Sequence, residues 1–128
     1  MAENKAEKYL KNIQERILHY RQQIDLIYSS LCNTEKDFIQ DRVQSTFSMD
    51  KLLNGLILIN EYEQKLEDYI VLGQRYISLL DSEAQRNILI AFYIDNQPVK
   101  EIASLFSYSI RHVYRVHDDA ISQLSEYI

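Results

Sequence analysis

Apolar residues recur at every third or fourth position along the first quarter of the chain. Between Asn4 and about Cys32 they stand at Leu10, Ile13, Ile17, Tyr20, Ile24, Ile27 and Leu31. This spacing is a heptad seam, which gives a helix one narrow apolar stripe. Asn4 can cap the helix by accepting a bond from an early backbone amide, and Glu7 stands three residues later, as in a capping box. The pattern predicts a long helix that begins at Asn4.

The pattern lapses between the first seam and the next. Over residues 33–50, Thr34, Ser45, Thr46 and Ser48 are interspersed among the scattered apolar residues Phe38, Ile39, Val43 and Phe47. No face of a helix is continuously apolar over this segment. We therefore expect a connector here, with at most one short helical piece.

A second seam follows the connector. Its members are Leu52, Leu56, Ile59, Leu66, Ile70, Gly73, Ile77 and Leu80. Glu63 and Gly73 weaken it. Two narrow stripes can pack as an antiparallel hairpin within one chain, or either seam, Leu10 to Leu31 or Leu52 to Leu80, can join two chains as a homodimer. Residues 1–80 are expected to form this helical hairpin or coiled coil.

Shorter helices are predicted over residues 81–128, which we expect to form a second domain. Ser82 is suited to cap a helix that continues to about Ile94, and Gln85 completes the capping box. Pro98 follows a polar stretch that ends this helix, because the residue before a proline avoids α geometry whereas proline suits a first helical turn.

Two more helices complete this domain. One is expected from Pro98 to about Phe106, and a turn at Ser107 and Tyr108 follows it. Ser109 is placed to cap a last helix over about residues 110–127. The expected order is three helices joined by short connections.

Composition agrees with an all-α chain. Glycine occurs twice and proline once in 128 residues, and 46% of the residues are hydrophobic. Few breakers favour long helices, and the period-two alternation typical of strands is missing. Cys32 is the single cysteine, no apolar signal region opens the chain, and apolar runs such as Leu56 to Ile59 are far below the ~20 residues of a membrane span. We expect a cytoplasmic protein without a membrane partner.

The segment around Ala103 has the pattern of a helix-turn-helix. Two steeply crossing helices need a small residue where their backbones approach, and Ala103 fills that position. The positions expected to face inward hold Ile102, Phe106, Tyr108, Val113 and Val116. The positions expected to face solvent hold Lys100, Glu101, Ser104 and Arg111.

The outer face of the last helix then carries the candidate DNA-contacting residues. They are Ile110, Arg111, His112, Tyr114 and Arg115, with His117 one turn further. Arginine can donate two hydrogen bonds to guanine in the major groove, and tyrosine or histidine can contact phosphates, sugars or base edges. Arg115 is the strongest single candidate for base recognition.

These residues carry a family resemblance. The segment from Pro98 to Phe106, continued through Val113-Tyr114-Arg115, resembles the fourth region of bacterial sigma factors, and the similarity extends back through Leu80-Asp81-Ser82-Glu83 and forward from Ala120 to Leu124. The whole chain, with Asp41-Arg42-Val43-Gln44-Ser45, is similar to small sigma-like regulators of phages and mobile elements of Gram-positive bacteria, nearest to the late-operon and autolysin-regulator (RinA/ArpU-like) group.

The resemblance implies a DNA-binding transcription regulator of late or packaging genes, with the last helix in the major groove. By position it assigns the DNA contacts to Ile110, Arg111, His112, Tyr114 and Arg115. Two features depart from the family pattern. Ser107 stands at a turn position that often holds glycine, at a cost of up to ~1–2 kcal/mol if the backbone is left-handed there. The recognition helix also carries fewer basic residues than sigma factors usually have.

Charge argues against strong DNA binding by a single copy. The formal net charge is -5, and phosphate neutralisation supplies most nonspecific affinity. From Ser82 onward the acidic residues outnumber the basic ones, Arg86, Lys100, Arg111 and Arg115. A homodimer would double the contacts. The alternative hypothesis is an adaptor that docks on RNA polymerase or another regulator with weak or no DNA binding; a purely structural coiled coil leaves the Ala103 pattern without a purpose.

No pattern of catalytic or metal-binding chemistry stands out. His19, His112 and His117 lack companions at ligand spacing, and Cys32 has no basic cluster beside it in the sequence. The chain has neither a glycine-rich phosphate loop nor a nucleophile elbow. We therefore expect no cofactor, no metal site and no enzyme activity.

Overall fold

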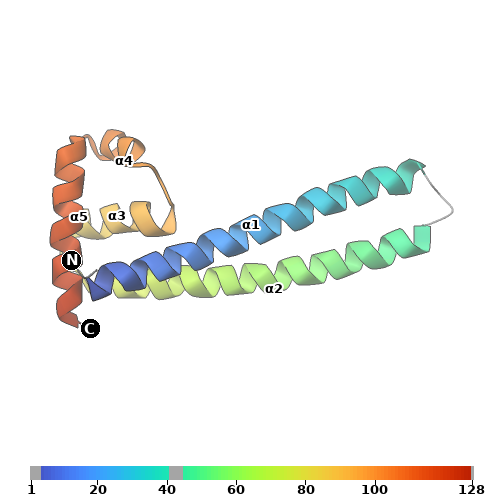
Figure 1. Ribbon diagram of the computed structural model, residues 1–128, viewed down its shortest axis with the longest axis horizontal. Coiled ribbons are helices and arrows are strands. Elements are labelled where there is room, and N and C mark those ends of the chain that lie inside the picture. Colours follow the sequence, from blue (N-terminus) through green and yellow to red (C-terminus); the bar gives the residue numbers. More distant parts are fainter. Residues whose placement is uncertain (1–3, 41–44, 128) are drawn as a thin grey trace. The chain divides into compact units, whose positions relative to one another are not determined.

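The computed structural model describes residues 4–40 and 45–127, and every regular element in these ranges is a helix. The elements are α1 (Lys5–Gln40), α2 (Ser45–Ile77), α3 (Glu83–Leu89), the π-helix η2 (Ile90–Ile94), α4 (Val99–Phe106), α5 (Ile110–Leu124) and the 3-10 helix η3 (Ser125–Tyr127) (Figure 1). The expected all-α class is confirmed. No helix in the described part of the chain combines the length and apolar character needed to cross a bilayer.

The expected connector over residues 33–50 is largely helical. α1 continues to Gln40 and α2 already begins at Ser45; residues 41–44, which hold most of the family motif Asp41 to Ser45, lie outside the described residues. The segment contains neither glycine nor proline, so a lapse in apolar periodicity does not stop a helix there. The lapse in apolar periodicity therefore does not mark the end of a helix.

The described chain forms two compact units, and their division differs from the expected boundary near residue 80. Unit 1 joins the residues up to Ile17 with those from Tyr69 onward, and unit 2 spans Leu18–Asp68. The two long helices therefore contribute to both units. The beginning of α1 and the end of α2 belong to the same body as α3, α4 and α5.

Unit 2 is built from α1 and α2 packed side by side in opposite directions (Figure 1). Ile24, Leu31 and Ile59 are its buried core. The ring of Tyr20 lies 5.8 Å from that of Tyr62. Tyr20 contacts Tyr62, whereas Leu31, further along α1, contacts Gly55, which is earlier in α2. The two helices are therefore antiparallel.

The second seam runs through Gly55 rather than through Leu56. A side chain added at Gly55 would meet Leu31 Cδ2 at 2.7 Å, so the space that this glycine leaves is filled by the leucine. Leu56, which we expected in the seam, is 47% exposed. The apolar pattern missed this register because glycine contributes no apolar side chain to read.

The first seam is buried within the single chain. Its members Leu10, Ile13, Ile17, Ile24 and Leu31 are all at most 8% exposed, while Tyr20 and Ile27 are half-buried. Fully burying an aliphatic side chain stabilises a fold by roughly 1.5–3 kcal/mol. This stripe is therefore already used without a second copy.

In unit 1, the beginning of α1 and the end of α2 pack against the π-helix η2. A Cβ atom at Gly73 of α2 would lie 2.6 Å from Ile94 Cδ1 and 3.3 Å from Ile13 Cγ2. From α1, the amide of Gln14 donates to the carbonyl oxygen of Phe92 at 2.9 Å and to Asn96 Oδ1 at 2.9 Å. Gly73 thus weakens the seam pattern because it makes room for η2.

Candidate nucleic-acid interface

A small apolar core holds α3, η2, α4 and α5 together. Its buried members are Ile88, Ala91, Ile102, Ala103 and Val113, and Phe92, Phe106, Tyr108 and Val116 pack against it. Every position that we expected to face inward around Ala103 belongs to this set, and Lys100, Glu101, Ser104 and Arg111 are exposed as expected. The core fixes how α5 is held against α4.

The connection between α4 and α5 is a tight left-handed turn. Ser107 has φ 59° and ψ 39°, the left-handed conformation anticipated for this position. The backbone amide of Tyr108 donates to the carbonyl of Ala103 at 2.9 Å, and that of Ser107 donates to Ser104 at 3.3 Å. This pair of bonds is a Schellman motif, which closes a helix and reverses the chain.

Ser109 then starts α5 directly after the turn. Its backbone is extended, and its hydroxyl accepts a hydrogen bond from the backbone amide of His112 at 3.1 Å. This is the cap predicted from the sequence. The cap fixes the first turn of α5, and the core shared with α4 fixes the orientation of this helix. Together they set the directions of the side chains that follow Ser109.

The structure exposes four of the five residues expected to contact DNA. Ile110, Arg111, Tyr114 and Arg115 are exposed. His112 is half-buried, and its ring stands edge-on to Tyr108, with ring centres 4.5 Å apart. His112 is therefore oriented by an aromatic contact, while the two arginines project one helical turn apart on one side of α5.

An open groove of about 410 Å³ lies beside these arginines. It is lined by Ser107, Tyr108, Ser109, Arg111, His112 and Arg115. Of these, Ser107 and Ser109 were expected as turn and cap residues, and Tyr108 as a turn residue that faces inward. The sequence signal for them was structural, and their place in the groove follows from the reversal of the chain at Ser107.

Arg111 and Arg115 make no ion pair or hydrogen bond with the residues that the structure describes. Arg86 differs, because it donates to the carbonyls of Leu80 and Asp81 in the connection between α2 and α3, at 2.7 and 3.0 Å. A cation used in this way is not available to a ligand. The uncompensated positive charge of α5 is therefore concentrated on its first two turns.

Acidic residues follow on the next turn of the same helix. Asp118 and Asp119 stand three and four residues after Arg115, and both are exposed. At these spacings the side chains lie on the neighbouring surface of the helix. The face thus changes from basic to acidic along α5, and an anionic ligand is favoured only near the turn.

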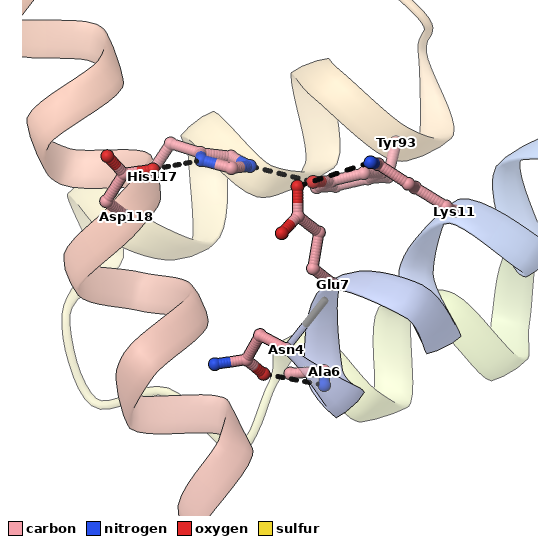
Figure 2. A network of polar contacts seen from close by, with 7 residues as sticks. All are labelled: Asn4, Ala6, Glu7, Lys11, Tyr93, His117 and Asp118. Carbon is pink, nitrogen blue, oxygen red and sulfur yellow. Dashed lines mark hydrogen bonds and ion pairs between the residues drawn. The ribbon is translucent and has the colours of Figure 1, made fainter. Parts of the chain in front are cut away.

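His117 belongs to the interior and not to the outer face where the sequence placed it. Its Nε2 atom lies 2.7 Å from the hydroxyl of Tyr93, and its Nδ1 atom lies 3.0 Å from Asp118 Oδ1 (Figure 2). The ring also packs on Phe92, with centres 4.9 Å apart. Position 117 lies four residues after the buried Val113 and three before the buried Ala120, so the helical spacing already indicated an inward side chain, a signal that our interpretation of the outer face overlooked.

No group of three or more His, Cys, Asp or Glu side chains in the described ranges is arranged to hold a metal ion. Scans against protein-family models, curated proteins and solved structures found no match to this chain. The residues of the candidate interface are therefore the basis for any inference about its ligand.

Proposed function

We propose that the chain is a sequence-specific DNA-binding transcription regulator that inserts the first two turns of α5 into the major groove. The observation that carries this proposal is the pair Arg111 and Arg115, one turn apart, exposed, and without a partner among the described residues. A guanidinium matches the N7 and O6 acceptors of guanine with two hydrogen bonds. Two such groups, one turn apart, favour an anionic ligand at this position.

The remaining exposed residues of α5 suit the same ligand. Ile110 and Tyr114 present apolar surface on the side flanking the arginines, and apolar side chains contact the methyl group of thymine. The beginning of α5 offers backbone N–H groups and the positive end of the helix dipole to a phosphate. Arg111 and Arg115 would then contact the bases, while the groove at Ser107 to Ser109 would accommodate the sugar-phosphate backbone of the DNA.

The resemblance to sigma-like regulators supports a narrower form of the proposal. In that form the chain controls late genes of a phage or mobile element, with α5 as the recognition helix. Asp118 and Asp119 limit the contact to a few phosphates, so binding by one copy is weak and its salt dependence is shallow. With two or three phosphates neutralised, log K should fall with log salt with a slope of roughly -2 to -3.

The test begins with selection of bound fragments from a random DNA pool. On the selected site, Arg115→Ala should weaken binding by about 1–3 kcal/mol, as expected for loss of one bidentate base contact. Lys51→Ala, which removes the same charge from unit 2, is the matched control and should leave affinity unchanged. Equal loss in both variants would mean that net charge and not the α5 face governs binding.

A second candidate function is an adaptor that docks on RNA polymerase. It is favoured by Leu105 of α4, which is 64% exposed on the same acidic module, since large exposed apolar side chains mark protein contacts more often than DNA contacts. In this case Leu105→Ser should abolish co-purification with polymerase while leaving the selected DNA site bound. Retention of polymerase by the variant would reject this role.

A further inference from the structure

One side of α2 within unit 2 exposes four large apolar side chains. Met49, Leu53, Leu56 and Ile57 are 48, 51, 47 and 59% exposed, respectively. Their spacing of four, three and one places them together on the helix surface. We call these four residues the outer α2 face.

The outer α2 face is separate from the seam that packs on α1. The seam uses Leu52, Gly55 and Ile59, where Ile59 is buried and Gly55 receives Leu31. Because Gly55 and not Leu56 contacts α1, Leu56 lies on the outside of the helix next to Leu53.

The surroundings of the outer α2 face are acidic. Asp50 stands one turn before Leu53, Glu61 one turn after Ile57, and Glu63 two turns after Leu56, and all three are exposed. Lys51 is two positions from both Met49 and Leu53, a spacing that directs it to another side of the helix. Lys65 lies 6.0 Å from the centre of the Tyr20 ring on α1. Neither lysine makes an ion pair with Asp50, Glu61 or Glu63.

The same excess appears over the whole segment. Residues 18–68 contain nine Asp and Glu but five Lys and Arg. Pairing two copies through this face would bring Asp50 and Glu61 against the same carboxylates of the other copy, and like charges at close range oppose association. A cationic partner turns the same charges into an attraction.

We propose that the outer α2 face binds an amphipathic helix of a partner protein, with apolar anchors flanked by lysine or arginine. Such a helix would present side chains at i, i+3 or i+4 and i+7 to Met49, Leu53 and Ile57. Its basic flanks would lie against Asp50 and Glu61. This assignment rests on unit 2 alone and is independent of DNA binding by α5.

The test uses the full chain and a labelled helical peptide of leucine and lysine, with leucine at the a and d positions of a heptad. Fluorescence anisotropy should show saturable binding that weakens as salt is added. The double variant Leu53→Ser/Ile57→Ser should bind at least about tenfold more weakly, because two aliphatic contacts are lost. Leu26→Ser, which removes an equally exposed leucine (58%) from α1, should change affinity less than about twofold.

Charge is tested separately. Glu61→Lys should weaken binding of the lysine peptide, and a peptide with glutamate in place of lysine should not bind. Equal affinity of wild type and the double variant, with both shown to be helical by circular dichroism, would overturn the proposal, as would absence of binding. If sedimentation shows that the wild type is a dimer and that the double variant is a monomer, the face binds a second copy of the chain. This result would also overturn the proposal.

Discussion

The hydroxyl of Tyr93 in η2 lies 2.7 Å from Nε2 of His117 in α5. The carboxylate of Asp118 can only accept, so Nδ1 of His117 donates to it at 3.0 Å, and Nε2 faces the hydroxyl of Tyr93 at hydrogen-bond distance. Tyr93 is 5% exposed. The bond therefore joins the π-helix to the helix of the candidate interface, away from most solvent.

Removing this hydroxyl should loosen the attachment of α5. Tyr93→Phe leaves Nε2 of His117 without this hydrogen-bond partner in a mostly buried place, which should lower the free energy of unfolding by about 1–2 kcal/mol. Urea denaturation followed by circular dichroism measures the change. Tyr114→Phe removes an exposed hydroxyl from α5 and should have no effect. Equal losses of stability in both variants would show that the bond between Tyr93 and His117 has no structural role.

Replacing Ser107 by glycine should stabilise the protein. The left-handed backbone at φ 59° costs a residue with a Cβ atom about 1 kcal/mol, which glycine avoids. Ser107→Gly should therefore raise the free energy of unfolding by about that amount. Ser104→Gly, inside α4, should instead lower it by roughly 0.5–1 kcal/mol, so destabilisation by both changes would argue against strain at the turn.

Adding one carbon at Gly73 should destabilise unit 1. Alanine gains about 1 kcal/mol in helix propensity, but its Cβ would lie 2.6 Å from Ile94 and 3.3 Å from the branched Ile13. Overpacking a core typically costs 1–3 kcal/mol, so the net loss should reach up to about 2 kcal/mol in thermal or urea unfolding. Gly55→Ala should cost less, because it meets only Leu31, which can change rotamer; a more stable Gly73→Ala variant would contradict this packing.

Alkaline pH should weaken the contact between Tyr76 and the end of α5. Burial raises the pKa of Tyr76, and the neighbouring Tyr9 adds to the increase; the hydroxyl donates to the carbonyl of Leu124 at 3.4 Å. Since the folded pKa exceeds the unfolded value of 10.0, the contribution is full below pH 10.0 and is lost as pH rises through the folded pKa.

The comparison of wild type with Tyr76→Phe isolates this contribution. The difference between their unfolding free energies should be constant from neutral pH to about pH 9 and should shift in favour of the phenylalanine variant above about pH 10. Tyr127→Phe, at an exposed position, provides the control with no expected pH-dependent difference. A difference for Tyr76→Phe that does not change with pH would reject the assignment.

The sequence predicted the parts of the fold that depend on local side-chain patterns. Ala103 and its apolar neighbours indicated the core between α4 and α5, and Ser82 and Ser109 are helix caps as expected, with hydroxyls that accept from Gln85 and His112. These signals are strong because each residue type performs one short-range task. The exposure of Arg111 and Arg115 followed from the same pattern.

The sequence could not predict features in which a missing side chain or a distant partner decides the packing. Gly55 and Gly73 are contact points because they have no side chain, which a search for apolar residues overlooks. The continuation of the helices into residues 33–50 depended on the absence of breakers rather than on periodicity. The hydrogen-bond partner of His117 is Tyr93, 24 residues away.

The hydrogen bonds of Gln14 to Phe92 and Asn96 span 78 and 82 positions of the chain. In contrast, unit 2 draws all its residues from the continuous segment Leu18–Asp68. Unit 1 closes only when its latest-made helices return to the earliest turns of α1, and contacts of such long range form slowly. On refolding, we therefore expect the antiparallel pair of unit 2 to form before the contact of α1 with η2.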